Sequence, residues 1–222
     1  MAGPVTDSRK LKGSEAYNPQ HQVMISEHLL SRGIMDKQVV RAMREVPRER
    51  FIDNGMATLA YEDHPLPIGE GQTISQPYIV AYMTEALELS NTDRVLEIGT
   101  GSGYAAAILS QIADTVHTVE RLGGLAQSVG YRNIVIHEGD GTLGWPEQAP
   151  YDAIVVTACA PEVPRPLLDQ LVIGGRLVIP VGVSPRLQTL FRVRRVGESD
   201  FHTEELCGVC FVPLVGAAGW RE

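Results

Sequence analysis

Residues 95–103 read Val-Leu-Glu-Ile-Gly-Thr-Gly-Ser-Gly, a short apolar run that leads into three alternating glycines. The apolar run predicts a buried strand, the glycines predict a tight turn, and the residues from Tyr104 onward predict a helix. Glycine lets the backbone approach a ligand closely, while a strand end and a helix start supply oriented N–H groups. This stretch therefore predicts a small-molecule cradle between a strand and a helix.

The spacing of the glycines limits which ligand the cradle can hold. The third glycine of a dinucleotide fingerprint would fall at position 104, which is Tyr104 in this chain. A tight fit to a pyrophosphate is therefore disfavoured. A tight connection between strand and helix without any ligand is the alternative interpretation of the glycines alone, so the decision depends on the residues that follow.

Acidic residues come at the ends of the next two predicted strands. Glu120 follows Glu97 by 23 residues, which is where a nucleotide-binding sheet carries the carboxylate that binds the ribose hydroxyls. Asp140, within Gly-Asp-Gly at 139–141, stands just past the third strand, where it can accept a hydrogen bond from an adenine amino group. Either acid alone could be a solvated strand end. Together with the glycine turn they predict one nucleoside-binding crevice.

Strand and helix patterns alternate from residue 94 onward, which is typical of βαβ units and a parallel sheet with helices on both faces. The last two strands have only a turn between them, so we expect an antiparallel pair at the edge of the sheet. Seven strands in this order are typical of methyltransferases that use S-adenosylmethionine (AdoMet), which predicts a Rossmann-like α/β fold. The expected strands are 95–98, 116–120, 134–136, 153–157, 176–181, 187–196 and 204–214.

A helical cap is expected before this core. Residues 1–19 are polar and predict a tail, and 20–222 predict one domain, with cap and substrate loop at 20–90 and the cofactor-binding core at 91–222. Apolar residues at helical spacing predict helices at 20–31 and 36–46. A loop is expected at 61–71, and Pro77 stands where a first-turn proline would begin a helix that ends near Leu89.

Composition excludes several classes of function. The 222 residues are 44% apolar and carry a net charge of −8, which favours one globular domain and opposes binding to nucleic acid or to anionic membranes. The chain has no run of about 20 apolar residues and no signal-peptide pattern, so we expect a cytoplasmic protein. The cationic cluster Arg192, Arg194 and Arg195 alternates with apolar residues and is interpreted as the solvent face of a strand.

The cysteines and histidines predict no metal site. Cys207 and Cys210 form a C-x-x-C in a run, 206–214, that is typical of a buried strand. Residues three apart on a strand point to opposite faces, so this pair should share neither a metal nor a disulfide. The six histidines show no metal-ligand spacing.

The chain from about Val23 to Trp220 resembles the protein-L-isoaspartate O-methyltransferases. The most specific match is the stretch Leu-Pro-Ile-Gly-Glu-Gly-Gln-Thr-Ile-Ser-Gln-Pro at 66–77, which looks like the family's substrate and cofactor loop. Further matches occur at 151–154, 171–180 and 212–214. General AdoMet methyltransferases lack the loop.

The resemblance implies a cofactor, a substrate and a set of site residues. AdoMet would be the methyl donor, S-adenosylhomocysteine the product, and isoaspartyl proteins and peptides the substrates. A monomer is expected separately, because no exposed interface helix stands out in the sequence. Ser75 occupies the position of the active-site serine. The cradle and the resemblance together predict cofactor contacts from Gln72, Thr73, Ile74, Glu97, Gly99, Thr100, Gly101, Ser102, Glu120, Asp140 and Gly141.

Several alternatives stay open at this point. Thr73 and Ser75 could simply cap the helix that begins at Pro77. Residues 121–130 are about two helical turns shorter than in the family, which would suit an adaptor that binds AdoMet or isoaspartyl peptides without turnover. A methyltransferase acting on a small molecule or an RNA is the other alternative. Independently, the Asn54-Gly55 pair predicts a site of isoaspartate formation in this chain itself, because glycine hinders succinimide closure least.

Overall fold

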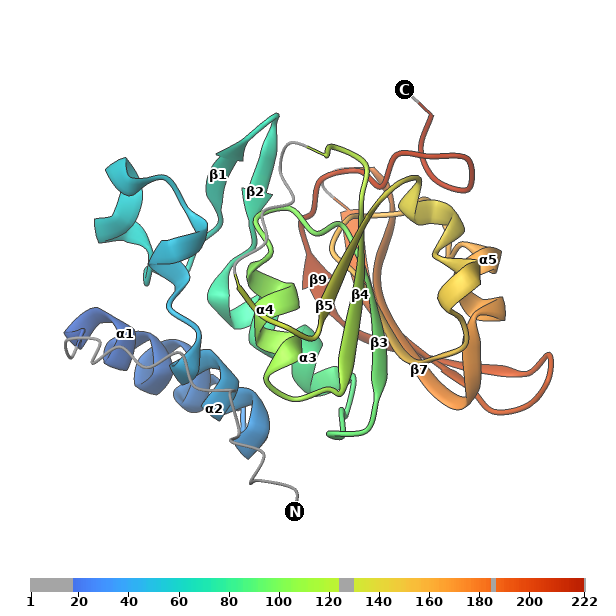
Figure 1. The fold of residues 1–222 in the computed structure, drawn as a ribbon, viewed down its shortest axis with the longest axis horizontal. Coiled ribbons are helices and arrows are strands. Elements are labelled where there is room, and N and C mark those ends of the chain that lie inside the picture. The colour runs from blue at the N-terminus through green and yellow to red at the C-terminus, as the bar shows by residue number, and fades with distance from the viewer. Residues whose placement is uncertain (1–17, 124–129, 185–186, 222) are drawn as a thin grey trace, which may run out of the picture.

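A seven-stranded sheet forms the centre of the protein (Figure 1), in a computed structural model that describes residues 18–123, 130–184 and 187–221. The strands lie in the order β5-β4-β3-β6-β7-β8-β9. The first five run parallel, and β7, β8 and β9 pair antiparallel. The predicted, mostly parallel sheet is therefore confirmed. Its strands are β3 (Arg94–Ile98), β4 (Thr115–Glu120), β5 (Ile134–Glu138), β6 (Tyr151–Val156), β7 (Leu171–Ser184), β8 (Leu187–Arg195) and β9 (Phe201–Val209).

The order of the strands sets where a ligand can bind. From β3 the chain first builds outward to β4 and β5, and then returns to the other side of β3 to add β6 and β7. In open α/β sheets the crevice for ligands lies outside the carboxyl ends of the strands at such a reversal. The glycine turn follows β3 directly, so it lies at this position.

Both faces of the sheet are covered, as expected for parallel strands. α3 (Pro77–Ala86) and α4 (Tyr104–Ser110) lie on one face and α5 (Arg165–Asp169) on the other (Figure 1). Two buried apolar clusters correspond to the two faces. The β3 side chains alternate between them, with Val95 in the first cluster and Leu96 and Ile98 in the second.

The expected alternation of strand and helix is wrong between β5 and β6. The described residues 139–150 contain only two 3₁₀ turns, at Gly141–Leu143 and Pro146–Gln148. Three glycines and two prolines within this stretch disfavour an α-helix. Trp145 covers the sheet instead, stacked on His137 at 4.6 Å and edge-on to His117 at 5.5 Å.

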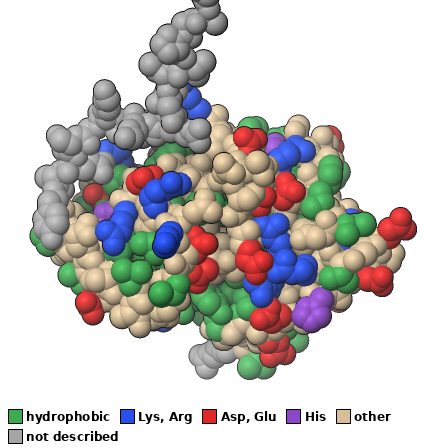
Figure 2. Space-filling view, turned by 90° about the horizontal axis from the view of Figure 1, so that it is seen from below, with side chains coloured by type: hydrophobic (Ala, Val, Ile, Leu, Met, Phe, Trp, Pro, Cys, Tyr) green, Lys and Arg blue, Asp and Glu red, His purple; other side chains and the backbone are tan. Residues whose placement is uncertain are grey.

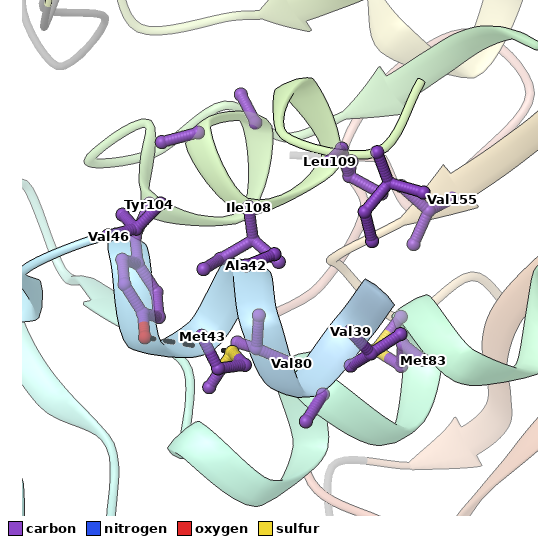
Figure 3. Packing of buried hydrophobic residues seen from close by; sticks show 14 of the residues in the cluster. Val39, Ala42, Met43, Val46, Val80, Met83, Tyr104, Ile108, Leu109 and Val155 are labelled. Carbon is purple, nitrogen blue, oxygen red and sulfur yellow. Dashed lines mark hydrogen bonds between the residues drawn. The ribbon is translucent and has the colours of Figure 1, made fainter. Parts of the chain in front are cut away.

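The cap packs its helix α2 (Lys37–Glu45) against α3 and α4. Asp36 begins this helix by accepting hydrogen bonds from the backbone N–H groups of Gln38 and Val39, at 2.7 and 3.0 Å. Figure 3 shows one side of α2 facing the two core helices. The predicted helix at 36–46 is confirmed. The side chains in this contact are Val39, Ala42, Met43 and Val46 from the cap, and Val80, Met83, Tyr104 and Ile108 from the core helices.

The single helix expected at 20–31 is broken into three segments. α1 (Pro19–Val23) continues into the π-turn Met24–Leu29 and the 3₁₀ turn Leu30–Arg32. Met24 and Leu29, five residues apart, are both fully buried. The i→i+5 hydrogen bonding of a π-turn places residues at this spacing on one side, which explains the departure from a regular α-helix.

The loop expected at 61–71 contains the first strand of a small hairpin, β1 (Leu66–Gly69) paired with β2 (Gln72–Ile74). Glu70 and Gly71 join the two strands with φ values of 51° and 68°, as a two-residue hairpin turn requires. Figure 1 shows this hairpin beside the sheet, separate from it. The hairpin leads directly into α3, which begins at Pro77 as predicted and ends at Ala86, three residues before the expected end.

The arginines of β8 are not a plain solvent face. Arg192 forms ion pairs with Glu88 and Glu204 at 2.7 and 2.6 Å, and also donates to the carbonyl of Ala86 at the end of α3. Arg194 pairs with Glu88 at 3.0 Å. The end of α3 is therefore tied to the sheet by cations, which suit the negative end of a helix. On the face shown in Figure 2, basic and acidic side chains lie interspersed with apolar ones.

The last strand is shorter than expected. β9 ends at Val209, so Cys210 lies beyond it, and the strand itself is half-exposed because it forms the edge of the sheet. Cys207 and Cys210 are both free thiols, but the buried strand that was expected to separate them does not reach Cys210. Within the described parts of the chain, no helix is both long enough and apolar enough to cross a membrane.

Candidate active site

A cavity of about 1150 Å³ opens at the carboxyl ends of β3, β4 and β6. Its walls come from the β1–β2 hairpin, the first turns of α3, the glycine turn and the segment after β9. Of the residues expected to contact substrate or cofactor, two are not among the lining residues, Glu97 and Asp140. Those that line the cavity are Gln72, Thr73, Ile74, Ser75, Gly99, Thr100, Gly101, Ser102, Glu120 and Gly141.

The turn after β3 can be built only from glycine at its key positions. Gly99 has a φ of 93° and Gly103 a φ of 83°, values that L-residues with a side chain rarely adopt. A Cβ on Gly99 would also lie 2.5 Å from Thr157 Oγ1. The turn therefore passes close to the end of β6 and leaves its other side open to the cavity.

Glu120 holds the glycine turn from the end of β4. Its Oε2 accepts a hydrogen bond from the backbone N–H of Gly101 at 2.8 Å, and its Oε1 accepts from the N–H of Leu122 at 2.9 Å. The side chain is 8% exposed. A carboxylate has about four acceptor positions, so this pattern leaves capacity for the two hydroxyls of a ribose.

Glu97 lies beneath the turn. Its side chain is fully buried and accepts a hydrogen bond from the hydroxyl of Thr118, which lies 2.6 Å from the hydroxyl of Thr100. Burial raises the pKa of Glu97 to about 8, so its carboxyl is mostly protonated at neutral pH. The geometry suits support of the turn through Thr118 and Thr100 better than direct contact with a cofactor.

Asp140 lies at the edge of the cavity and holds two segments together. Its Oδ1 accepts from the N–H and hydroxyl of Thr142 at 2.9 and 2.7 Å, and its Oδ2 accepts from the N–H of Ala217 at 2.7 Å. Burial alone would raise the pKa of Asp140, but the hydrogen bonds from Ala217 and Thr142 hold it below its ordinary value. Gly141 reaches the cavity itself, and a Cβ there would lie 2.5 Å from Ile98 Cγ2.

Ser75 stands between the hairpin and α3, on the cavity wall. The alternative that Thr73 or Ser75 caps α3 is wrong. The N-cap residue is Gln76, and the helix has no hydrogen bond from a capping side chain. Asp63 takes this role from outside the helix, accepting from the N–H of Tyr78 at 3.2 Å. The hydroxyl of Ser75 makes no hydrogen bond among the described residues, so it can bind a ligand.

Sequence reasoning missed part of the cavity wall. Thr157, at the end of β6, donates to the carbonyl of Gly99 at 2.7 Å, and the rule about strand ends at the reversal point would have found it. Gln188 clamps the backbone of Phe211, its amide nitrogen donating to the carbonyl at 2.9 Å and its amide oxygen accepting from the N–H at 2.6 Å. No local pattern marks Gln188 or the wall that it supports.

The donor set suits a nucleoside with an amino-acid tail. The Glu120 carboxylate, the glycine turn and several hydroxyls line the cavity together with apolar side chains such as Ile79 and Val80. Within the segments that the structure describes, no three potential ligands come together to hold a metal ion. The segment 121–130, which was expected to be short, falls largely outside the described residues, because 124–129 are not described.

The chain is similar in sequence to known protein-L-isoaspartate O-methyltransferases. Residues 19–219 match the sequence model of the protein-L-isoaspartate(D-aspartate) O-methyltransferase family. The chain is 70% identical over 208 residues to protein-L-isoaspartate O-methyltransferase 2 of Pelobacter propionicus, covering 90% of this chain and 92% of the relative. It is 66% identical over 208 residues to protein-L-isoaspartate O-methyltransferase 1 of Geotalea uraniireducens, covering 90% and 95%.

Solved structures agree with the sequence matches. A protein-L-isoaspartate O-methyltransferase superposes with a TM-score of 0.81 at 30% identity, over 90% of this chain and 67% of that one. A putative enzyme of the same name from Plasmodium falciparum, solved in complex with S-adenosyl-L-homocysteine, gives 0.73 at 26% identity, over 88% and 98%. The fold is thus that of the methyltransferases.

Proposed function

Because the chain belongs to the protein-L-isoaspartate(D-aspartate) O-methyltransferase family, we propose that it methylates the free α-carboxylate of L-isoaspartyl residues in damaged proteins and peptides. AdoMet is the methyl donor, and the products are a methyl ester and S-adenosylhomocysteine. One observation supports the assignment of this reaction to the cavity. The hairpin with Ser75 and the glycine turn held by Glu120 line a single cavity at the reversal point of the sheet.

The cofactor would lie along the glycine turn. Glu120 would accept hydrogen bonds from the ribose hydroxyls, and the loop at Gly141 would contact the adenine. The backbone of Gly99, Gly101 and Ser102 and the hairpin residues 72–74 would hold the methionine part, a distribution that rests on their position in the cavity lining. At Gly99 and Gly141 a Cβ would lie 2.5 Å from Thr157 Oγ1 and Ile98 Cγ2, so both loops pack closely against the sheet beside the cavity that they line.

The reaction needs no general base in this site. AdoMet supplies an electrophilic methyl group on a sulfonium sulfur. An α-carboxylate has a reference pKa near about 3.5 and is already ionised at neutral pH, so the side chains have no proton to remove. Catalysis then comes mainly from orientation of the carboxylate toward the methyl group, a contribution of up to about 7 to 11 kcal/mol in favourable cases.

Ser75 would orient the substrate. Its hydroxyl has no other partner among the described residues and lies on the cavity wall, so it can donate a hydrogen bond to one carboxylate oxygen. The other oxygen would then face the methyl group. The clamp between Gln188 and Phe211 would keep the neighbouring wall in shape.

The methyl ester makes repair possible after it leaves the enzyme. Methoxide leaves an ester carbonyl far more readily than oxide leaves a carboxylate. The backbone nitrogen of the next residue therefore attacks the ester carbonyl and gives up its proton, and methanol leaves as the succinimide forms. Hydrolysis of the succinimide partly yields normal aspartate. This step uses no residue of the protein.

One experiment separates the proposal from its alternatives. The protein is incubated with tritiated AdoMet and an isoaspartyl peptide, beside the same peptide with normal aspartate. Base-labile label on the isoaspartyl peptide alone is the expected result. Label on neither peptide, with AdoMet still bound in calorimetry, would favour an adaptor or a methyltransferase of another substrate, such as a small molecule or an RNA.

The remaining partner assignments stay predictions. We infer from the net charge of −8 that the protein does not bind nucleic acid or anionic membranes, and we expect a cytoplasmic monomer. Sedimentation of the purified protein tests the monomer. One chain has a mass of 24.2 kDa. A species of twice this mass would contradict the monomer.

A further inference from the structure

The C-terminal segment, residues 212–220, folds back over the end of the sheet to form part of the cavity wall. Residues 212–215 line the cavity. The rest of the segment does not line it and lies against the loop that follows β5. Two sets of hydrogen bonds connect the segment to the protein, and they come from different sides.

The first set joins the segment to Asp140 and Thr142. The N–H of Ala217 donates to Asp140 Oδ2 at 2.7 Å, and the N–H of Ala218 donates to Thr142 Oγ1 at 3.0 Å. The Thr142 hydroxyl in turn donates to Asp140 Oδ1 at 2.7 Å. Thr142 is fully buried, so its two bonds are partly shielded from water, whereas the bond from Ala217 to Asp140 is exposed to solvent.

The second set joins the segment to Cys159, which lies three residues beyond the end of β6. The carbonyl of Cys159 accepts from the N–H of Leu214 at 2.8 Å and from the indole N–H of Trp220 at 2.9 Å. The N–H of Cys159 donates to the carbonyl of Val212, also at 2.8 Å. Cys159 thus holds the segment at both ends, through Val212 and Leu214 at one end and Trp220 at the other. The cavity-lining residues 212–215 precede the contact of Ala217 with Asp140.

Two glycines make this close contact possible. A Cβ on Gly216 would lie 2.0 Å from Asp140 Oδ1 and 2.7 Å from Thr142 Cγ2. A Cβ on Gly219 would lie 2.3 Å from the carbonyl oxygen of Leu214. Any side chain at Gly216 must therefore push the segment away from Asp140.

We propose that Asp140 and Thr142 are positioning residues for the substrate wall, and that a nucleoside bound beside Gly141 and a peptide bound against residues 212–215 stabilise one another through this contact. The proposal rests on the proposed function for the identity of the peptide. It differs from a direct adenine contact, because here the Asp140 carboxylate acts on the wall through Ala217. Such coupling is reciprocal, and its usual size is roughly 5- to 150-fold in affinity.

The first test uses S-adenosylhomocysteine and elastase, with no peptide. Elastase cleaves after small residues, and the segment offers Ala217 and Ala218. In the unaltered protein, saturating S-adenosylhomocysteine should slow cleavage in the segment at least fivefold. In Gly216→Ala the protection should be lost while S-adenosylhomocysteine still binds in calorimetry. Equal cleavage with and without ligand in the unaltered protein would overturn the proposal.

The second test measures substrate kinetics. Gly216→Ala and Thr142→Val should each raise the KM of an isoaspartyl peptide about tenfold or more, and leave kcat at saturating peptide within about threefold. Arg221→Ala, a change at an exposed residue just past the segment, is the matched control and should behave as the unaltered protein does. A purely structural defect would lower kcat and the fraction of folded protein together. An unchanged KM in both variants contradicts the proposal.

The two tests separate this inference from the proposed function. Ligand protection of the segment without methylation of any isoaspartyl peptide would support the coupling and refute the substrate. Methylation of the peptide without protection, and with an unchanged KM in Gly216→Ala, would refute the coupling alone. If Gly216→Ala does not fold, Thr142→Val keeps both tests available, because it removes one hydroxyl from a buried site and adds no clash.

Discussion

The backbone N–H of Gly101 donates to Glu120 Oε2 across 2.8 Å, so the turn after β3 and the end of β4 meet at the wall of the cavity. The carboxylate therefore holds the glycine turn, and in the proposed function it also binds the ribose of the cofactor. Both are lost together when the side chain is removed.

Replacement of this carboxylate should weaken cofactor binding. We expect Glu120→Ala to raise the Kd for AdoMet at least tenfold, which corresponds to about 1.4 kcal/mol. Calorimetry measures the change, with Glu147→Ala as the control, since Glu147 is exposed in the turn before β6. An unchanged Kd in Glu120→Ala would remove Glu120 from the cofactor site.

Replacement of Ser75 should separate turnover from cofactor binding. Ser75→Ala removes the hydroxyl proposed to orient the carboxylate, so kcat should fall by about 10- to 1000-fold. The Kd for AdoMet should stay within about threefold, and Ser31→Ala, at an exposed serine of the cap, should leave both constants unchanged. Full activity in Ser75→Ala would refute the role of this hydroxyl, since the cap of α3 does not depend on it either.

The buried carboxyl of Glu97 should make stability depend on pH. Burial raises the pKa of Glu97 to about 8, against an ordinary value near about 4.3 in the unfolded chain. Between these two values the folded protein binds a proton that the unfolded chain releases, so the free energy of unfolding should fall as pH rises, by about 1.4 kcal/mol per pH unit from this group. Above about pH 8 its contribution should level off.

Glu97→Gln isolates this effect. The amide keeps the shape and cannot ionise, so the variant should gain stability relative to the unaltered protein as pH rises from 5 to 8. Urea unfolding at several pH values gives the two curves. A constant difference across that range would show that the carboxyl of Glu97 is not protonated in the folded state.

The chain's own Asn-Gly pair should form isoaspartate, at a rate that the neighbouring Asp53 limits. Asn54 is exposed, but the N–H of Gly55, whose nitrogen must attack to form the succinimide, donates to Asp53 Oδ1 at 2.7 Å. We expect isoaspartate to accumulate at Asn54 during incubation at mildly alkaline pH, and faster in Asp53→Ala. Asp140-Gly141 should stay intact, because Thr142 and Ala217 hold the Asp140 carboxylate.

Peptide mapping by mass spectrometry decides between these two sites. Fresh enzyme with labelled AdoMet should also methylate an aged peptide that spans Asn54. Isoaspartate at Asp140 beside an intact Asn54 would contradict the contacts that hold the loop at Gly141.

Local patterns were sufficient for most of the fold. Apolar runs and glycine breaks predicted all seven strands of the large sheet and the antiparallel pair at its edge, because a strand and its turn are decided by neighbouring residues. They failed where the signal was ambiguous. The hairpin at 66–74 contains Pro67 and Gly69 in its first strand and Glu70 and Gly71 in its turn, and such short strands form only because the rest of the site packs against them.

Glu97 and Glu120 also differ in how well the sequence predicted their positions. The acid of the glycine motif, Glu97, was expected in the cofactor site and lies instead beneath the turn, bonded to Thr118. Which way a β3 side chain points depends on the faces that α3, α4 and the 3₁₀ turns cover, and no motif records that. Glu120, at the end of its strand, lines the cavity where the sequence predicted it.

The glycine turn, the seven strands of the large sheet and the acid at the end of β4 could be predicted from the amino-acid sequence, because each depends on residues within a few positions along the chain. Ser75 was predicted from the family resemblance of the loop at 66–77. The contacts of Asp140 with Ala217, 77 residues away, and of Gln188 with Phe211, 23 residues away, could not be predicted in this way. A hydrogen bond between distant residues is specified by the order and register of the whole sheet. That order results from the burial of both faces at once, and no single stretch of the chain contains it.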